Sequence, residues 1–142
     1  MDPEFKETRR LLEERWQDRG FDRLLPEEQD FVVLWWLEAE VLNGGFHQYF
    51  FNSAGDGALR AVAALDTLGA PSTAGILREA LSQLACTPYL ADTEKRRDHL
   101  AGLEQQWSRF DAVTDRLQDF PEDFVSLAIA RVQSAHEENG IF

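Results

Sequence analysis

Three aspartates in the C-terminal third of the chain, Asp111, Asp115 and Asp119, recur at intervals of four residues. On an α-helix this interval places successive side chains about 40° apart around the axis and about 6 Å apart along it. The three carboxylates would therefore form a row on one helix face. Their spacing is of the same order as that of phosphates along a nucleic-acid strand, and the lysines and arginines of DNA-binding proteins recognise charge of that kind.

Four more acidic residues extend this candidate partner-binding surface. We call the full set of seven the acidic face: Asp98, Glu104, Asp111, Asp115, Asp119, Glu122 and Asp123. Glu122 and Asp123 follow Pro121, where a new helix is expected to start. An ordinary solvated helix face is the competing interpretation, because acids at a helix start are favoured by the helix dipole alone.

The element that must position the three aspartates is a helix over about residues 106–120. Its apolar side chains lie about 180° to 320° from Asp111 on a helical wheel. These residues are expected to face the core: Trp107, Phe110, Val113, Leu117 and Phe120. The aspartates then point away from the core.

A second group of polar side chains lies within an unusual aromatic segment, N-G-G-F-H-Q-Y-F-F-N-S-A-G, over residues 43–55. Adjacent glycines allow the backbone to reverse direction with positive φ. Because His47, Gln48 and Asn52 alternate with aromatic residues, we expect them to be partly buried and to need hydrogen-bond partners. They either tie helix ends and turns together or, with Tyr49, line a pocket for a peptide or small ligand.

Catalysis and metal binding have little support in the residue spacing. His47, His99 and His136 are the three histidines, and none lies in an H-E-x-x-H or inward Glu-x-x-His pattern. We expect His136 to sit at a solvated helix end. The single cysteine excludes a cysteine-based zinc site. We therefore expect no metal, no cofactor and no enzymatic activity.

Composition limits the class of protein further. The 142 residues include 26 acidic and 14 basic side chains, for a net charge of −12, and 44% are hydrophobic. So much apolar material argues against disorder, and the charge argues against direct binding to nucleic acid or anionic membranes. Residues 98–142 carry nine acids and three bases, which is half of the net charge. One cysteine fits a reducing cytoplasm.

The pattern of apolar residues predicts an all-α fold: one compact domain of about seven or eight helices over residues 6–142. Residues 1–5, which include Asp2-Pro3-Glu4-Phe5, look like an expression scar. The expected helices cover about residues 5–19, 26–43, 46–51, 58–68, 71–84, from 94 onward, 106–120 and 121–140. The helix over 26–43 is apolar nearly all round and should lie at the centre of the core. Its cover comes either from the same chain or from a homodimer partner.

The glycine segment also carries a family resemblance. The run Asn43-Gly44-Gly45-Phe46-His47-Gln48, followed by Phe50, Asn52-Ser53 and Gly55, resembles the signature of the small acidic bacterial DNA-mimic protein family. The similarity extends over about residues 25–138. It implies an all-α fold and, for the best-known member, a dimer whose acidic surface imitates DNA and occupies a helix-turn-helix transcription factor. The signature residues are not the acidic ones, so they mark the fold.

These observations predict a cytoplasmic, non-enzymatic protein whose acidic face binds a basic DNA-binding protein, with a role in transcription regulation. Two alternatives remain open at this point. One is a peptide- or small-molecule-binding domain with a pocket around His47 and Asn52. The other is an immunity-type protein that neutralises a basic toxin.

Overall fold

The computed structural model describes residues 3–142, all helices, turns and connections without a β-strand. In this range the α-helices are α1 (Lys6–Arg19), α2 (Pro26–Phe51), α3 (Ala58–Leu68), α4 (Pro71–Leu84), α5 (Thr93–Ala101), α6 (Asp111–Gln118) and α7 (Phe124–Glu138). Three short 3₁₀ turns are η1 (Pro3–Phe5), η2 (Phe21–Arg23) and η3 (Ser53–Gly57). The predicted all-α single domain is therefore confirmed. Within residues 3–142, no helix is long and apolar enough to cross a membrane.

The suspected expression scar falls partly outside the described range. Met1 and Asp2 lie outside it, so that expectation is not addressed for them. Of the remaining residues, Phe5 packs its partly buried ring against the core.

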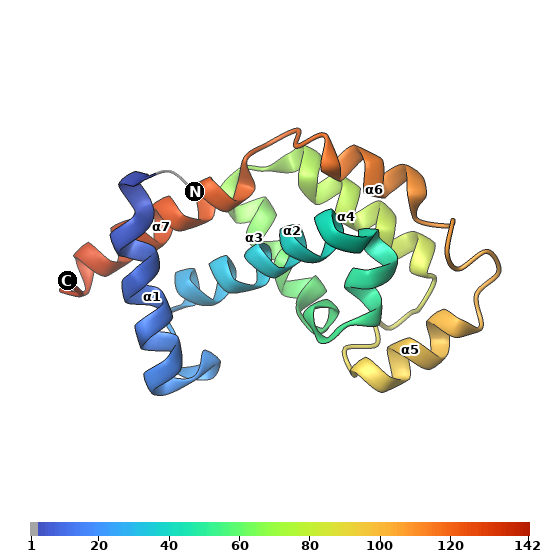
Figure 1. Ribbon diagram of the computed structural model, residues 1–142, viewed down its shortest axis with the longest axis horizontal. Coiled ribbons are helices and arrows are strands. Elements are labelled where there is room, and N and C mark those ends of the chain that lie inside the picture. The colour runs from blue at the N-terminus through green and yellow to red at the C-terminus, as the bar shows by residue number, and fades with distance from the viewer. Residues whose placement is uncertain (1–2) are drawn as a thin grey trace.

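The long helix α2 forms the centre of the molecule (Figure 1). Pro26 begins it, at a position where the missing N–H is not needed. Leu34, Leu37 and Val41 are fully buried, because α3, α5, α6 and α7 all contact this helix. Helices α1 and α7 lie at one end of α2, and α4, α5 and α6 lie toward the other. The prediction of a central helix is confirmed. Helices of the same chain cover most of α2, while Trp36 and Leu42 remain exposed.

The predicted interruption at the glycine pair is present as a kink within α2. Gly45 has φ +74°, a conformation that favours glycine. A Cβ atom at Gly45 would lie 3.0 Å from the Thr114 hydroxyl oxygen. The same hydroxyl accepts a 3.0 Å hydrogen bond from the Phe46 N–H. The glycine pair thus bends α2 at the point where it packs against α6.

Arg96 of α5 is fully buried and holds together the region that follows α2. Its guanidinium donates to the carbonyl oxygens of Phe50 at 2.6 Å and Asn52 at 2.8 Å. It also donates to the Leu90 and Ala91 carbonyls and to the Asp56 carboxylate. The last carbonyls of a helix lack intrahelical hydrogen-bond donors. At the end of α2, Arg96 provides such donors.

Gly55 leaves the room that this arrangement requires. A Cβ atom there would lie 2.6 Å from the Tyr49 carbonyl oxygen and 2.9 Å from the Arg96 Nη2 atom. The Tyr89 hydroxyl donates to the Gly55 carbonyl at 2.5 Å. The N-S-x-G end of the aromatic segment is therefore a requirement of packing around Arg96.

The predicted helix over residues 106–120 is wrong in extent. Helix α6 covers only Asp111–Gln118, and residues 102–110 form turns. Gln105, with φ +52°, and Phe120, with φ +49°, have left-handed backbone that a helix does not contain. Trp107 consequently lies outside the helix and is 72% exposed, and Phe120 is also exposed, against the expectation that both face the core.

The expectation for His136 is also wrong. It is 3% exposed, and its Nε2 lies 3.0 Å from the Glu28 carboxylate. Glu28 is itself fully buried and accepts two hydrogen bonds from Arg15, at 2.8 and 2.9 Å, and one from the Leu25 N–H. This Arg15–Glu28–His136 cluster joins α1, α2 and α7. A buried carboxylate has to be paired, and α7 folds over it.

Gly55→Ala is expected to lower the free energy of unfolding by about 2 kcal/mol or more, because the new Cβ overpacks the space beside Arg96. Gly75→Ala is the matched control, since nothing lies within 4 Å of its Cβ position on α4. That substitution should stabilise the protein by about 0.5–1 kcal/mol. Urea unfolding of both variants measures the two effects, and equal values for them would contradict the packing role of Gly55.

Glu28→Gln is expected to reduce stability at pH 7 by roughly 3 kcal/mol, because it leaves a partly buried guanidinium without its charge partner. Burial disfavours the charged carboxylate, but hydrogen bonds from Arg15, His136 and Leu25 outweigh it and hold the pKa of Glu28 below 4.5. The stabilisation is therefore present above pH 4.5 and is lost as the pH falls through that lowered pKa. The stability difference between wild type and variant should shrink in the same range. Glu27→Gln is the control and should change stability by less than about 0.5 kcal/mol, both at pH 7 and below pH 4.5.

Candidate functional site

Helix α6 carries the row of aspartates at the surface. Asp111 and Asp115 lie on the helix and Asp119 directly follows it, and all three are exposed. Val113 and Leu117 are buried on the opposite side. Although α6 is shorter than predicted, its aspartates face the solvent and its apolar side chains face the core, as expected.

Asp98 on α5 and Glu104 in the following turn are exposed as well. Within residues 3–142, none of the five exposed carboxylates of Asp98, Glu104, Asp111, Asp115 and Asp119 forms an ion pair. Arg116, which lies between two of the aspartates in sequence, pairs instead with Glu79 of α4. The Arg109 guanidinium donates to the backbone carbonyls of Glu104 and Gln83. These five carboxylates therefore direct uncompensated negative charge to the solvent.

Glu122 and Asp123, the other two members of the acidic face, also form hydrogen bonds at the starts of helices. Glu122 accepts hydrogen bonds from the backbone N–H groups of Ser72 and Thr73, at 3.1 and 2.7 Å, at the start of α4. Burial opposes ionisation of Glu122, but its bonds from Thr73 and Ser72 hold its pKa below 4.5. Asp123 caps α7 by accepting from the Ser126 N–H. Both carboxylates still add to the negative charge beside α6.

The polar residues of the aromatic segment serve different purposes. Gln48 and Asn52 donate their side-chain N–H groups to the same oxygen of Glu40, at 2.7 and 3.0 Å. His47 stacks against exposed Trp107 with a centroid separation of 4.0 Å, and partial burial lowers its pKa below 6.5. Tyr49 is fully buried. The structure therefore brings Gln48 and Asn52 together on Glu40 and directs His47 elsewhere. Asn43 and Gly44 are exposed at the kink.

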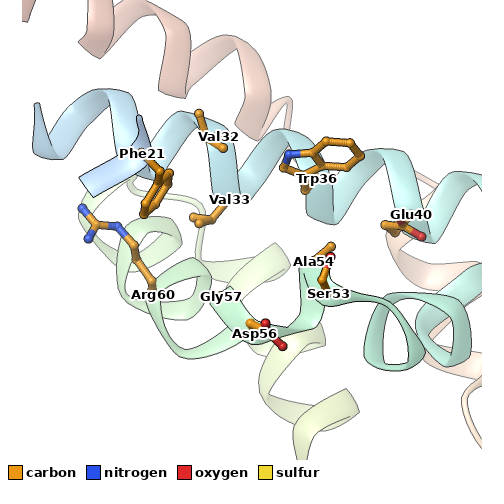
Figure 2. Close-up of a pocket in the computed structure, with 10 residues that line it drawn as sticks. All are labelled: Phe21, Val32, Val33, Trp36, Glu40, Ser53, Ala54, Asp56, Gly57 and Arg60. Atoms are coloured by element: carbon orange, nitrogen blue, oxygen red, sulfur yellow. The ribbon is translucent and has the colours of Figure 1, made fainter. Parts of the chain in front are cut away.

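A cleft of about 530 Å³ lies next to this segment, between α2 on one side and η3 and α3 on the other (Figure 2). Val33, Trp36 and Glu40 line it from α2, and Ala54 and Asp56 face them from η3. Sequence reasoning missed this site because its two walls come from separate elements of the chain, α2 and η3, and meet only in the fold. The signal within reach was Trp36 and Glu40, which share a helix face at a four-residue interval. Among residues 3–142, no three His, Cys, Asp or Glu side chains are placed to hold one metal ion.

These features define a class of protein: a small acidic all-α domain with a bent central helix and an exposed row of carboxylates. The chain belongs to the DMP19-like protein family, whose model matches residues 22–136. The matched range contains the kink, Arg96, the whole acidic face and every residue that lines the cleft except Phe21. Neither the comparison with curated proteins nor that with solved structures gave a match.

Glu122→Ala is expected to lower the free energy of unfolding by about 1 kcal/mol, because the first turn of α4 loses a capping acceptor. Asp119→Ala, three residues earlier and without a hydrogen-bonded side chain among the described residues, should change it by less than about 0.5 kcal/mol. Thermal or urea unfolding at pH 7 distinguishes the two carboxylates. If Asp119→Ala lowered the free energy of unfolding more than Glu122→Ala, the capping role of Glu122 would be contradicted.

Proposed function

We propose that this protein is a non-enzymatic interaction protein whose acidic face occupies the DNA-binding surface of a basic DNA-binding protein. The observation that carries the proposal is the row of exposed Asp111, Asp115 and Asp119 without ion-pair partners among the described residues. Membership of the DMP19-like family supports it, because the family that the glycine segment resembles includes a member whose acidic surface imitates DNA.

The distribution of charge favours the C-terminal third as the binding surface. On α1, the acids Glu7 and Glu14 pair with Arg10, and Glu13 pairs with Arg9. Such mixed charges have a weak field at a distance, because each acid is accompanied by a base. The carboxylates of α6 and its neighbours have no such compensation, so a basic surface meets them as it would meet phosphates.

A partner of this kind works where DNA is present, and we propose that the protein acts in the cytoplasm of a bacterium, as the family resemblance implies. An immunity-type role against a basic toxin would use the same acidic face. The identity of the partner separates these two functions, because only a DNA-binding partner is displaced by duplex DNA.

The test compares capture of basic proteins from a cell extract at low salt by wild type and by the triple variant Asp111→Asn, Asp115→Asn and Asp119→Asn. Wild type should capture a DNA-binding protein that duplex DNA displaces. The triple variant should bind that protein at least ten-fold more weakly, with a shallower dependence on salt, because three charge contacts are lost.

The matched control removes three acids from α1: Glu7→Gln, Glu13→Gln and Glu14→Gln. It changes net charge equally and should leave affinity within about two-fold of wild type. Equal weakening by both triple variants would contradict a localised acidic face, as would failure to capture any basic protein at low salt. A captured basic protein that does not bind DNA would favour the immunity-type role.

A further inference from the structure

We propose that the cleft between α2 and η3 receives an arginine side chain, with its apolar stem along Val33 and Ala54 and its guanidinium stacked on Trp36 beside Glu40. The inference rests on the proposed function in one respect, since the arginine is assigned to the basic partner. It adds a second, shape-specific contact to the charge of the acidic face.

The shape of the cleft suits one long side chain. Its volume of about 530 Å³ leaves ample room for one arginine side chain. In Figure 2, Val33 and Trp36 lie along one wall and Ala54 and Gly57 face them, while Arg60 and Glu40 stand at opposite ends. The middle of the cleft is therefore apolar and its ends carry charge.

The charges at the two ends are not equivalent. Arg60 donates to the Asp30 carboxylate at 2.9 Å and to the Pro26 carbonyl at 3.2 Å, so its charge is compensated outside the cleft. Asp56 accepts from buried Arg96 at 2.9 Å. Glu40 accepts only neutral amide donors and has no ion pair among the described residues. The cleft therefore has one uncompensated negative charge, at the Glu40 end, and it favours a cation there.

Trp36 supplies a surface for the flat part of such a cation. Its ring packs edge-on against Trp35, with centroids 5.1 Å apart, and remains 38% exposed. Glu40 lies one helical turn further along the same face, about 6 Å along the axis. Guanidinium groups stack on tryptophan and donate in the plane of the group to carboxylates. Arginine satisfies both features at once, whereas an ammonium group has no planar surface to stack.

Two residues of the aromatic segment orient the Glu40 carboxylate. Gln48 and Asn52 both hold the Oε2 atom of Glu40, and Oε1 makes no hydrogen bond to another described residue. The carboxylate is thus oriented before a ligand arrives, which reduces the entropy lost on binding. Two residues of the family signature therefore act as positioning residues for Glu40.

The direct test titrates the full chain with the peptide acetyl-Gly-Arg-Gly-amide and follows the Trp36 indole N–H signal by NMR. A saturable shift of this signal is expected. The same peptide with citrulline, which keeps the shape but lacks the charge, should bind at least ten-fold more weakly. Trp36→Ala and Glu40→Gln should each weaken the arginine peptide at least five-fold, with the fold of each variant checked by circular dichroism.

Glu137→Gln is the control, because it removes one exposed acidic charge at the end of α7, outside the lining of the cleft, and should leave peptide affinity unchanged. Absence of a saturable Trp36 shift would overturn the proposal, as would equal affinity for the citrulline peptide or for a third probe, acetyl-Gly-Lys-Gly-amide, which keeps the charge but lacks the planar group. These results do not depend on the acidic face, whose own test is capture of the basic partner. If Trp36→Ala leaves capture of that partner unchanged while it abolishes peptide binding, the assignment of the arginine to the partner is overturned.

Discussion

The buried guanidinium of Arg96 is the interaction on which the rest of the structure depends. A charge in the interior is tolerated only when its donors are satisfied, and here four backbone carbonyls and one carboxylate satisfy them. Those acceptors belong to the end of α2, to η3 and to the connection before α5. One side chain therefore joins three segments, and the hydrogen bonds from Tyr89 to Gly55 and from Arg97 to Phe51 reinforce the same junction. Asp56 on the cleft wall is held in place by Arg96.

The net charge of −12 separates into charges with structural roles and charges without them. Glu28 holds three helices together, Glu122 and Asp123 begin helices, and Glu7, Glu13 and Glu14 of α1 are paired with arginines. Five carboxylates without an ion pair among the described residues lie on α5, on or directly after α6, and in the turn between these helices: Asp98, Glu104, Asp111, Asp115 and Asp119. Other unpaired acids, such as Asp18 on α1 and Glu138 on α7, lie apart from this group. The net charge alone would be compatible with a role in solubility only. Because some acids have structural partners and others do not, the fold produces a local negative surface.

Sequence patterns were sufficient for the features that depend on local chemistry. The all-α class, the central apolar helix, the kink at Gly44–Gly45 and the outward direction of Asp111 and Asp115 follow from periodicity and glycine conformation. What they missed depends on distant partners. Arg96 is one of two adjacent arginines in a polar stretch, and nothing local marks it as buried. His136 lies in a segment that resembles a solvated helix end until Glu28, 108 residues away in sequence, meets it. Trp107 seemed to belong to a helix that left-handed Gln105 excludes.

The signature segment is connected to both surfaces, although it contains none of the acids of the acidic face. At its start, Gly45 allows the close approach of Thr114, which sets α6 and its aspartates against α2. At its end, Gln48 and Asn52 orient Glu40, and the Asn52 carbonyl accepts from Arg96. Substitutions in this segment therefore act on the acidic face and on the cleft through the backbone that carries them. A fold-defining motif and a binding surface need not share residues, because the motif determines where the charged residues lie.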